Sequence, residues 1–419
     1  MAKTSFGFKK IILFALVLRL FLAPFSYHQD VEVNYWWGKF AVDFPLRGYY
    51  DWLEFGGYTH PNQPMLYIYL YQAVRYTYLF GYNLLWWINV HIPLFPSNLM
   101  SWYFLYGNYF LEKLPFILSD LLLIYFVYLF IKKYFSTRIA LLASLILAFY
   151  PPLIYNSSLW GGNESLLNLL GLLSVYLFYK NKNIFGALSF TLCLLFKSSL
   201  LIFLPVILVI FFKNKPNPKD LILTFLLPVV TTLVLAYPFA TGPLLPWLFN
   251  SYLKIFLPGI MPFLTANAFN FWALFFGLVP RLDEIKILPL ISAYGFSTLI
   301  GTIYLVLSAI KLFNNYHLKN ILLTLVKISL FSFVFLTRMH ERYSYPILIP
   351  LYLLCFFDKQ FIKYFIILTI THLLNVYHGW WIPPLPFLIS LLKFEPTIRF
   401  ISLLNLVLAV KLITINVKK

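Results

Sequence analysis

Residues 199–238 read SLLIFLPVILVIFFKNKPNPKDLILTFLLPVVTTLVLAYP, two apolar runs separated by a short break that carries Lys213, Lys215 and Lys219. A helix that crosses the hydrocarbon core of a bilayer needs about 17–25 largely apolar residues. Neither run alternates apolar and polar residues as the strands of a membrane barrel do. The stretch therefore predicts two membrane-spanning helices joined by a short basic loop.

The same pattern recurs along the whole chain of 419 residues. Hydrophobic residues make up 61% and charged residues 11%, whereas a soluble domain carries about 25% charged residues. We expect an all-α membrane protein, a multi-pass bundle of about 10–13 spans. Residues 1–419 would form one polytopic domain with no separate soluble domain. The expected spans lie near 11–26, 104–131, 139–155, 165–179, 184–197, 199–212, 221–238, 290–312, 319–337, 344–357, 361–377 and 398–413, with a break near Lys197.

Basic residues gather on one side of this series of spans. The breaks on that side contain many Lys and Arg residues but only Asp220 and Asp358 as acids. The positive-inside rule makes it the cytoplasmic side of a plasma (inner) membrane, with both termini there. Arg19 interrupts the first apolar run and no small-residue cleavage site follows, so we expect a span rather than a signal peptide. The net charge is +18, but the sequence contains no nucleic-acid-binding motif. We therefore expect no nucleic-acid partner.

Three long segments, 27–103, 239–289 and 378–397, are expected to be extracytoplasmic loops. Residues 64–95 are rich in tyrosine and tryptophan, which favours helices that lie in the outer membrane interface. The first of these loops is expected to be divided into short pieces by Pro45, Pro61, Pro64, Pro93 and Pro96. Long loops on a compact frame commonly carry function, so we place the candidate site on this face.

An acidic segment, His28-Gln29-Asp30-Val31-Glu32, directly follows the first expected span. In extended backbone, side chains two residues apart point the same way, so Asp30 and Glu32 would converge on one ligand. A carboxylate here suits a general base. Two other interpretations remain: a solvated acidic loop, and metal ligation by His28, Asp30 and Glu32.

A basic segment, Thr337-Arg338-Met339-His340-Glu341-Arg342-Tyr343, ends a later span. Several ionisable groups beside hydrocarbon are costly unless they meet a charged partner. Arg338, His340 and Arg342 are therefore candidates to hold a phosphate, and Glu341 to orient one of these cations. The alternative is that the arginines extend toward lipid headgroups.

Further polar residues lie at the outer ends of other spans. Lys113 and Asp120 share a helix face and are expected to serve either the site or a buried ion pair. In Trp160-Gly161-Gly162-Asn163-Glu164, the glycines predict a turn, and Glu164 is expected to begin the next helix. Lys197 has no partner nearby in the sequence, which makes it a candidate anion ligand.

The last motif is Asn267-Ala268-Phe269-Asn270-Phe271-Trp272 in the second long loop. Two amides beside aromatic rings are able to hydrogen-bond and stack on a sugar. The alternative, favoured when the motif stands alone, is a helix start that Asn270 caps and Trp272 anchors at the interface.

The ordered set of these motifs resembles the GT-C superfamily of integral membrane glycosyltransferases, near the bacterial polyprenyl-phosphate-sugar-dependent, mannosyltransferase-like branch. The resemblance rests on Asp30-x-Glu32, Lys113-Leu114-Pro115 leading to Asp120, Trp160–Glu164, Lys197, Asn267–Trp272 and Met339–Tyr343, over about residues 10–350. Many relatives place the two acids of the first loop side by side, whereas here Val31 separates them. Which of the two acts as base therefore stays open.

The resemblance implies a GT-C bundle with an extracytoplasmic active site. Asp30 would be the base, with Glu32 as its helper or a ligand of acceptor or metal. Arg338, His340, Arg342 and Lys197 would bind the donor phosphate. The implied reaction transfers a hexose or pentose from a polyprenyl-phosphate-linked donor to a lipid, glycan or protein acceptor with inversion; a divalent metal is possible. The alternative is a transporter or flippase for a polyprenyl-linked saccharide, which broken helices and inverted repeats would favour.

Overall fold

The computed structural model describes residues 7–51, 55, 57, 59–257 and 261–415. Glu54 of the first loop and Lys3, Lys418 and Lys419 near the termini lie outside this part of the chain. The protein is 77% helical, which confirms the predicted all-α class in outline. The chain forms two compact units, one of Met1–Leu173, Ala187–Ser198 and Leu223–Leu257 and the other of Ser174–Gly186, Ser199–Ile222 and Pro258–Lys419.

The first unit holds the N-terminal helices, and α7, α8 and α10 are divided between the two units. Its elements are α1 (Phe8–Leu22), α2 (Gln29–Asp43), η1 (Tyr49–Asp51), α3 (Met65–His91), α4 (Asn98–Tyr134), α5 (Thr137–Ala148), α6 (Pro151–Ile154), the π-helical turn η2 (Tyr155–Trp160), α7 (Glu164–Tyr179), α8 (Asn183–Phe196), α10 (Pro218–Ala236), η4 (Tyr237–Phe239), α11 (Leu244–Ser251) and the π-helical turn η5 (Tyr252–Phe256).

Helices α1 and α4 pack antiparallel in this unit. The ring of Phe8 at the start of α1 stacks on Tyr128 of α4 with centroids 4.2 Å apart. At the other end, Lys113 Nζ donates to the carbonyl of Ala23 at 2.7 Å. Midway, Arg19 Nε donates to Asp120 at 2.7 Å, and both side chains are fully buried. A charged residue within an apolar helix is thus neutralised by a partner on the neighbouring helix.

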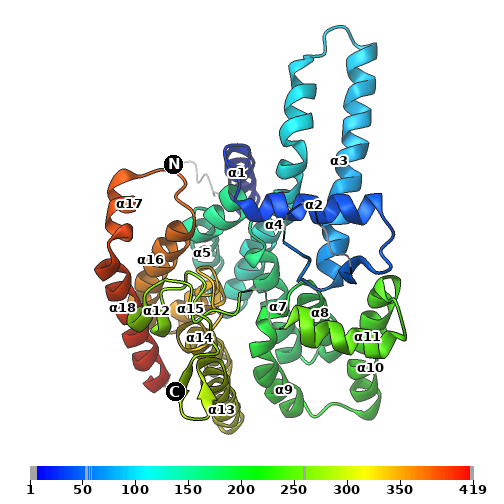
Figure 1. Ribbon diagram of the computed structural model, residues 1–419. Helices are drawn as coiled ribbons and strands as arrows, with labels where there is room; N and C mark the ends of the chain where they lie inside the picture. Colours follow the sequence, from blue (N-terminus) through cyan, green and yellow to red (C-terminus); the bar gives the residue numbers. More distant parts are fainter. Residues whose placement is uncertain (1–6, 52–54, 56, 58, 258–260, 416–419) are drawn as a thin grey trace. The chain divides into compact units, whose positions relative to one another are not determined.

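One expectation for the first long loop is wrong. Residues 65–91 form the single continuous helix α3 rather than several short pieces. Pro64 is its N-cap residue, where a missing N–H costs nothing, and Pro93 and Pro96 lie in the turn before α4. All three prolines therefore bound the helix instead of breaking it. Figure 1 shows α3 and α4 as a long antiparallel hairpin that extends beyond α1 and α2.

The second unit contains the C-terminal helices and a small antiparallel hairpin that the sequence did not predict. Its elements are η3 (Ser198–Phe203), α9 (Leu204–Lys213), α12 (Phe271–Phe276), β1 (Lys286–Leu288), β2 (Ile291–Ser292), α13 (Ala293–Asn314), α14 (Leu318–Phe335), η6 (Tyr345–Ile347), α15 (Leu348–Phe357), η7 (Lys359–Phe361), α16 (Ile362–Gly379), α17 (Pro386–Lys393) and α18 (Glu395–Thr414). Leu288 pairs with Ile291 across the two strands. The predicted break near Lys197 is confirmed, since α8 ends at Phe196.

Five helices of the described chain are long and apolar enough to cross a membrane: α4, α10 (with η4), α13, α14 and α18. A sixth is present if α5 and the segment Pro151–Trp160, which are bent by 46°, count as one span. The other expected spans, near 11–26, 165–179, 184–197, 199–212, 344–357 and 361–377, are also largely helical but shorter or less apolar. Length and composition thus indicate a membrane protein with about five spans.

Candidate functional site

The acidic segment after α1 folds as the start of α2. His28 is the N-cap residue, and its Nδ1 accepts a hydrogen bond from the backbone N–H of Asp30 at 3.1 Å. The predicted extended backbone over 28–32 is therefore wrong. Residues two apart in a helix lie about 200° apart around its axis, so Asp30 and Glu32 point to different sides. Both carboxylates lie in the first turn, where the helix dipole stabilises negative charge.

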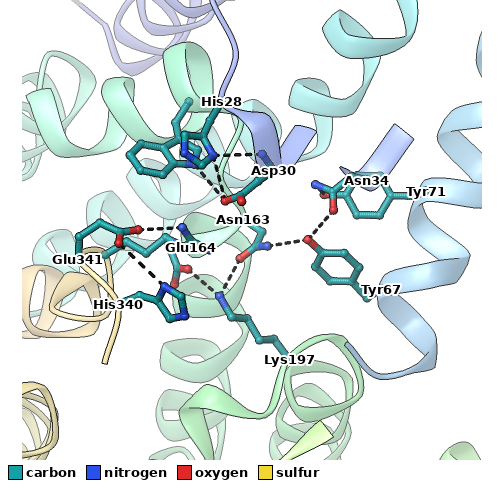
Figure 2. A network of polar contacts seen from close by, with 12 residues as sticks. His28, Asp30, Asn34, Tyr67, Tyr71, Asn163, Glu164, Lys197, His340 and Glu341 are labelled. Carbon is teal, nitrogen blue, oxygen red and sulfur yellow. Dashed lines mark hydrogen bonds and ion pairs between the residues drawn. The ribbon is translucent and has the colours of Figure 1, made fainter. Parts of the chain in front are cut away.

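Asp30 accepts a hydrogen bond from Trp160 and stays accessible. Trp160 Nε1 donates to Asp30 Oδ2 at 3.3 Å, and His28 Nδ1 lies 3.3 Å from the same oxygen. The rings of His28 and Trp160 stack with centroids 4.1 Å apart. The Asp30 side chain remains 40% exposed. Figure 2 shows the Asp30 carboxylate beside His28; the hydrogen bond from Trp160 therefore orients the group without enclosing it.

Lys113 fixes the backbone on both sides of this pair. Its buried ammonium donates to the carbonyls of Ala23 at 2.7 Å and Ser158 at 2.8 Å, and also to those of Ser26 and Leu159. Ala23 and Ser26 follow α1, and Ser158 and Leu159 belong to η2. Carbonyls at a helix end lack an intrahelical donor and need another partner. Lys113 therefore aligns the segment that carries Asp30 with the turn that carries Trp160.

Asp120 organises a separate network and does not pair with Lys113. Its Oδ2 accepts from Arg19 Nε and from the Ser157 hydroxyl, each at 2.7 Å, and its Oδ1 accepts from Ser165. The carboxylate is fully buried. The sequence left two roles open for Asp120, a part in the site or a buried ion pair. The contacts of Asp120 match the buried ion pair, within a network that joins α1, α4, η2 and α7.

The sequence suggested that Lys197 is a lone cation, but the structure pairs it with Glu164. Its Nζ lies 2.8 Å from Glu164 Oε1, and both side chains are buried. Glu164 begins α7 as predicted. Lys197 also approaches Asn163 Oδ1 at 3.5 Å, and Asn163 Nδ2 donates to Tyr67 OH at 3.2 Å. Tyr67 OH in turn donates to Asn34 Oδ1 at 3.0 Å. Figure 2 shows this chain of contacts, which connects α8, α7, α3 and α2.

Glu112 is a further buried acid, which the sequence analysis did not single out. It accepts from Asn108 Nδ2 at 2.6 Å, while its Oε2 and Asn108 Oδ1 have no hydrogen-bond partner among the described residues. The guanidinium of Arg75 lies over the rings of Tyr35 and Tyr78, at 5.3 and 4.8 Å from their centroids. Its position within the apolar run 104–131 could have identified Glu112 as a candidate residue, since acids are rare in membrane spans.

The second unit brings the two C-terminal motifs together. The backbone N–H of Arg338 donates to the carbonyl of Phe263 at 3.0 Å, and that of Ala266 donates to the carbonyl of Met339 at 2.9 Å. His340 also bridges to Ala266 and Asn267. Arg338 and Asn267 both have left-handed backbone, with φ of 62° and 64°. Non-glycine residues seldom adopt this conformation outside constrained sites, so the surrounding hydrogen bonds fix these two segments firmly.

Arg338 is held by an acid that the sequence did not single out. Its Nε and Nη2 donate to the two oxygens of Asp283 at 2.6 and 3.2 Å, a bidentate pair. Asp283 is fully buried, and Thr337 Oγ1 donates to it at 3.0 Å. The hydrogen bonds and charge of Asp283 hold the pKa of Arg338 above its usual value. Arg338 therefore has an established partner within its own unit.

Glu341 orients a cation as expected. Its Oε1 lies 2.9 Å from Arg342 Nη1, and its Oε2 lies 3.9 Å from His340 Nδ1. Glu341 is buried, whereas the side chains of Arg342 and His340 are 20% and 24% exposed. The side chains of Arg342 and His340 are thus partly accessible beside a buried carboxylate.

The two amides of the Asn267–Trp272 motif differ in role. Asn270 is buried, and its Oδ1 caps α12 by accepting from the N–H groups of Trp272 and Ala273. The capping alternative is therefore confirmed for Asn270. Trp272 is buried and donates to the carbonyl of Phe335 at 3.0 Å, so interfacial anchoring is wrong. Asn267 is exposed at its left-handed position, which leaves its side chain accessible to a ligand.

Among the described residues, no group of three or more His, Cys, Asp and Glu side chains is arranged to hold a metal ion. His28, Asp30 and Glu32 are included in that finding, because α2 separates the two carboxylates. Comparison with known proteins finds no matching family model and no matching curated protein. The function is therefore inferred from the contacts of the two clusters themselves.

Proposed function

We propose that this protein is a membrane glycosyltransferase of the GT-C type. Its donor would be a sugar linked to polyprenyl phosphate, and its acceptor a lipid, glycan or protein at the extracytoplasmic face of the plasma membrane. The observation that carries the proposal is the state of Asp30. It accepts a hydrogen bond from Trp160, whose ring stacks on His28, and stays accessible, whereas Glu112, Asp120 and Glu164 are buried. An acid of this kind suits a general base.

In the proposed reaction, Asp30 accepts the proton of an acceptor hydroxyl. The oxygen of that hydroxyl attacks the anomeric carbon of the donor sugar as the bond from this carbon to the phosphate oxygen breaks. The polyprenyl phosphate leaves with the bonding electron pair, and direct displacement inverts the anomeric configuration. Glu32, in the same helical turn but on another side, would assist acceptor binding rather than share the proton.

The leaving phosphate needs fixed positive charge. Within the second unit, Arg342 and His340 are the proposed phosphate ligands because they are partly exposed beside a buried carboxylate. Arg338 and Lys197 each already have a carboxylate partner, at 2.6 and 2.8 Å. We therefore propose that Arg338 and Lys197 contribute less to phosphate binding than Arg342 and His340 do. Asn267 is the proposed contact for sugar hydroxyls. Trp160 and Lys113 position Asp30, while Asp120 and Glu164 support the packing of the same unit.

A reconstitution experiment tests the proposal. The purified protein is placed in liposomes with radiolabelled polyprenyl-phosphate mannose, glucose or arabinose and a cell-envelope extract that supplies acceptors. We expect label to move from the donor into a glycosylated product with one of these sugars. Movement of intact donor across the bilayer without product would contradict the proposal and favour the flippase.

A further inference from the structure

The outer part of the α3–α4 hairpin contains no formal charge. Between Arg75 and Glu112 the sequence has no Lys, Arg, Asp or Glu. A water-exposed segment of this length would carry charge at about a quarter of its positions. Residues 76–111 are instead rich in tyrosine, tryptophan and phenylalanine. We call residues 76–111 the uncharged hairpin; Figure 1 shows it as the part of α3 and α4 that extends farthest from α2.

The uncharged hairpin has a defined structure. The rings of Tyr78 and Tyr103 stack with an interplanar angle of 1°, and Tyr103 OH donates to the carbonyl of Tyr78 at 3.1 Å. A Cβ on Gly81 would collide with Tyr103 OH, so glycine permits this close approach. At the turn, Ser97 Oγ donates to Asn89 Oδ1 at 2.8 Å. The two helices therefore present one fixed surface.

That surface is apolar on several sides. Phe80, Leu84 and Trp87 follow one another along one face of α3, and all three are exposed. Trp86 and Val90 are exposed on a second face, as are Phe104 and Leu105 on α4. Leu94 at the turn is 94% exposed. Exposed apolar side chains on more than one face favour an apolar surrounding, and a single protein partner would cover only one of these faces.

The contacts of α1 indicate which side of the membrane the uncharged hairpin occupies. α1 accompanies α4 from Tyr128 to Lys113. Lys9 and Lys10 of α1 and Lys132 and Lys133 of α4 therefore lie toward one end of this pair, which is the cytoplasmic end by the positive-inside rule. Residues 98–111 continue α4 for about 20 Å at the opposite end. The uncharged hairpin thus lies on the outer side.

We propose that the uncharged hairpin is immersed in the outer leaflet of the membrane, near the boundary between headgroups and acyl chains. The exposed apolar surface of α4 continues without a charged break from Phe104 to Leu118, Leu122 and Leu129, in a helix already apolar enough to cross the bilayer. Tilt accommodates a helix longer than the hydrocarbon thickness. Tyrosine and tryptophan are the residues enriched at this depth.

A fluorescence experiment tests this position in the full-length protein. Cys193 and Cys355 are replaced by alanine, and one cysteine is introduced by Leu84→Cys or Val90→Cys and labelled with an environment-sensitive dye. The protein is reconstituted in phosphatidylcholine vesicles that carry a doxyl quencher at a shallow or a deep acyl position. Ile303→Cys, exposed midway along α13, is the deep lipid control, and Asn314→Cys, exposed at the last residue of α13, is the water control.

We expect the labels at Leu84 and Val90 to be quenched several-fold more than the label at Asn314, and more by the shallow than by the deep quencher. Quenching as low as at Asn314 would overturn the proposal. A dye that reports an apolar surrounding without lipid quenching would also overturn it and indicate a protein partner or a second copy.

A second measurement requires no label. Trp86→Phe with Trp87→Phe keeps both exposed positions aromatic, and we expect the variant to fold as the wild type does. Brominated phosphatidylcholine should quench a smaller fraction of the tryptophan fluorescence in this double variant than in the wild type, because two lipid-exposed rings are removed. An unchanged or larger quenched fraction would show that these tryptophans do not contact lipid.

Discussion

At the scale of single residues, each of three buried or partly buried cations in the described chain pairs with a buried carboxylate. Arg19 pairs with Asp120, Lys197 with Glu164 and Arg338 with Asp283. Removing one member of such a pair leaves an uncompensated charge in a medium that solvates it poorly. The pairs therefore explain why charges persist in so apolar a chain, independently of any catalytic role.

The pair of Lys197 and Glu164 provides a first prediction. Lys197→Met should lower the free energy of unfolding by about 3–5 kcal/mol because Glu164 is left buried and unpaired. The double variant Lys197→Met/Glu164→Gln should recover most of that loss, as measured by thermal unfolding in detergent. If the double variant is as unstable as the single one, the ion pair is not what Lys197 contributes to folding.

Glu112 and Asp120 provide a matched comparison on the same helix. Asp120 accepts three side-chain hydrogen bonds, whereas Glu112 accepts one from Asn108 and has an open oxygen. Asp120→Asn should destabilise the protein by about 3 kcal/mol or more, while Glu112→Gln should change stability by less than about 1 kcal/mol. Thermal unfolding of both variants checks this. Equal losses would mean that Glu112 has a partner of similar importance.

At the scale of elements, hydrophobic runs predicted nearly every long helix, because an apolar segment in lipid satisfies its backbone only by helix formation. Where individual helices and strands begin and end was harder to predict from the sequence. The start of α2 looked like a loop because its helix is capped by His28, which is not a common cap. α3 looked broken because prolines flank it. Lys286–Leu288 and Ile291–Ser292 are too short to give a strand signal.

The turn at Gly161 provides a prediction at this scale. Gly161 has φ of 84°, and a Cβ there would press on Val31 of α2. Gly161→Ala should lower stability by about 1–2 kcal/mol and reduce sugar transfer, since Val31 is next to Asp30. Gly242→Ala, where a Cβ meets no atom within 4 Å, is the control. Equal thermal stability and transfer in both variants would exclude this role of the turn.

At the scale of the whole molecule, the sequence predicted the membrane class and the polar motifs but not how the motifs meet. Asp30 and Trp160 are brought into contact across 130 residues, and Arg19 and Asp120 across 101. Such pairings depend on how the helices pack, which hydropathy does not specify. Each unit nevertheless gathers its own motifs, the acidic and tryptophan segments in one and the asparagine and arginine segments in the other.

The predicted orientation is open to a direct test in cells. Gly242→Cys lies in an expected outer loop and Asn314→Cys in an expected cytoplasmic connection, and both positions are exposed. A membrane-impermeant thiol reagent should label the first variant in intact cells and the second only after the membrane is permeabilised. The reverse pattern would place the candidate site on the cytoplasmic face.

The central claim, that Asp30 is the base of a sugar transfer, is tested most directly by comparing Asp30→Asn with Asp43→Asn in reconstituted liposomes. Both acids lie on α2, but Asp43 pairs with Lys39 far from Trp160. The initial rate of label transfer from the polyprenyl-phosphate sugar should fall at least about 100-fold in Asp30→Asn, the usual contribution of a general base, and stay near wild type in Asp43→Asn. Full activity in a correctly folded Asp30→Asn variant would contradict the claim.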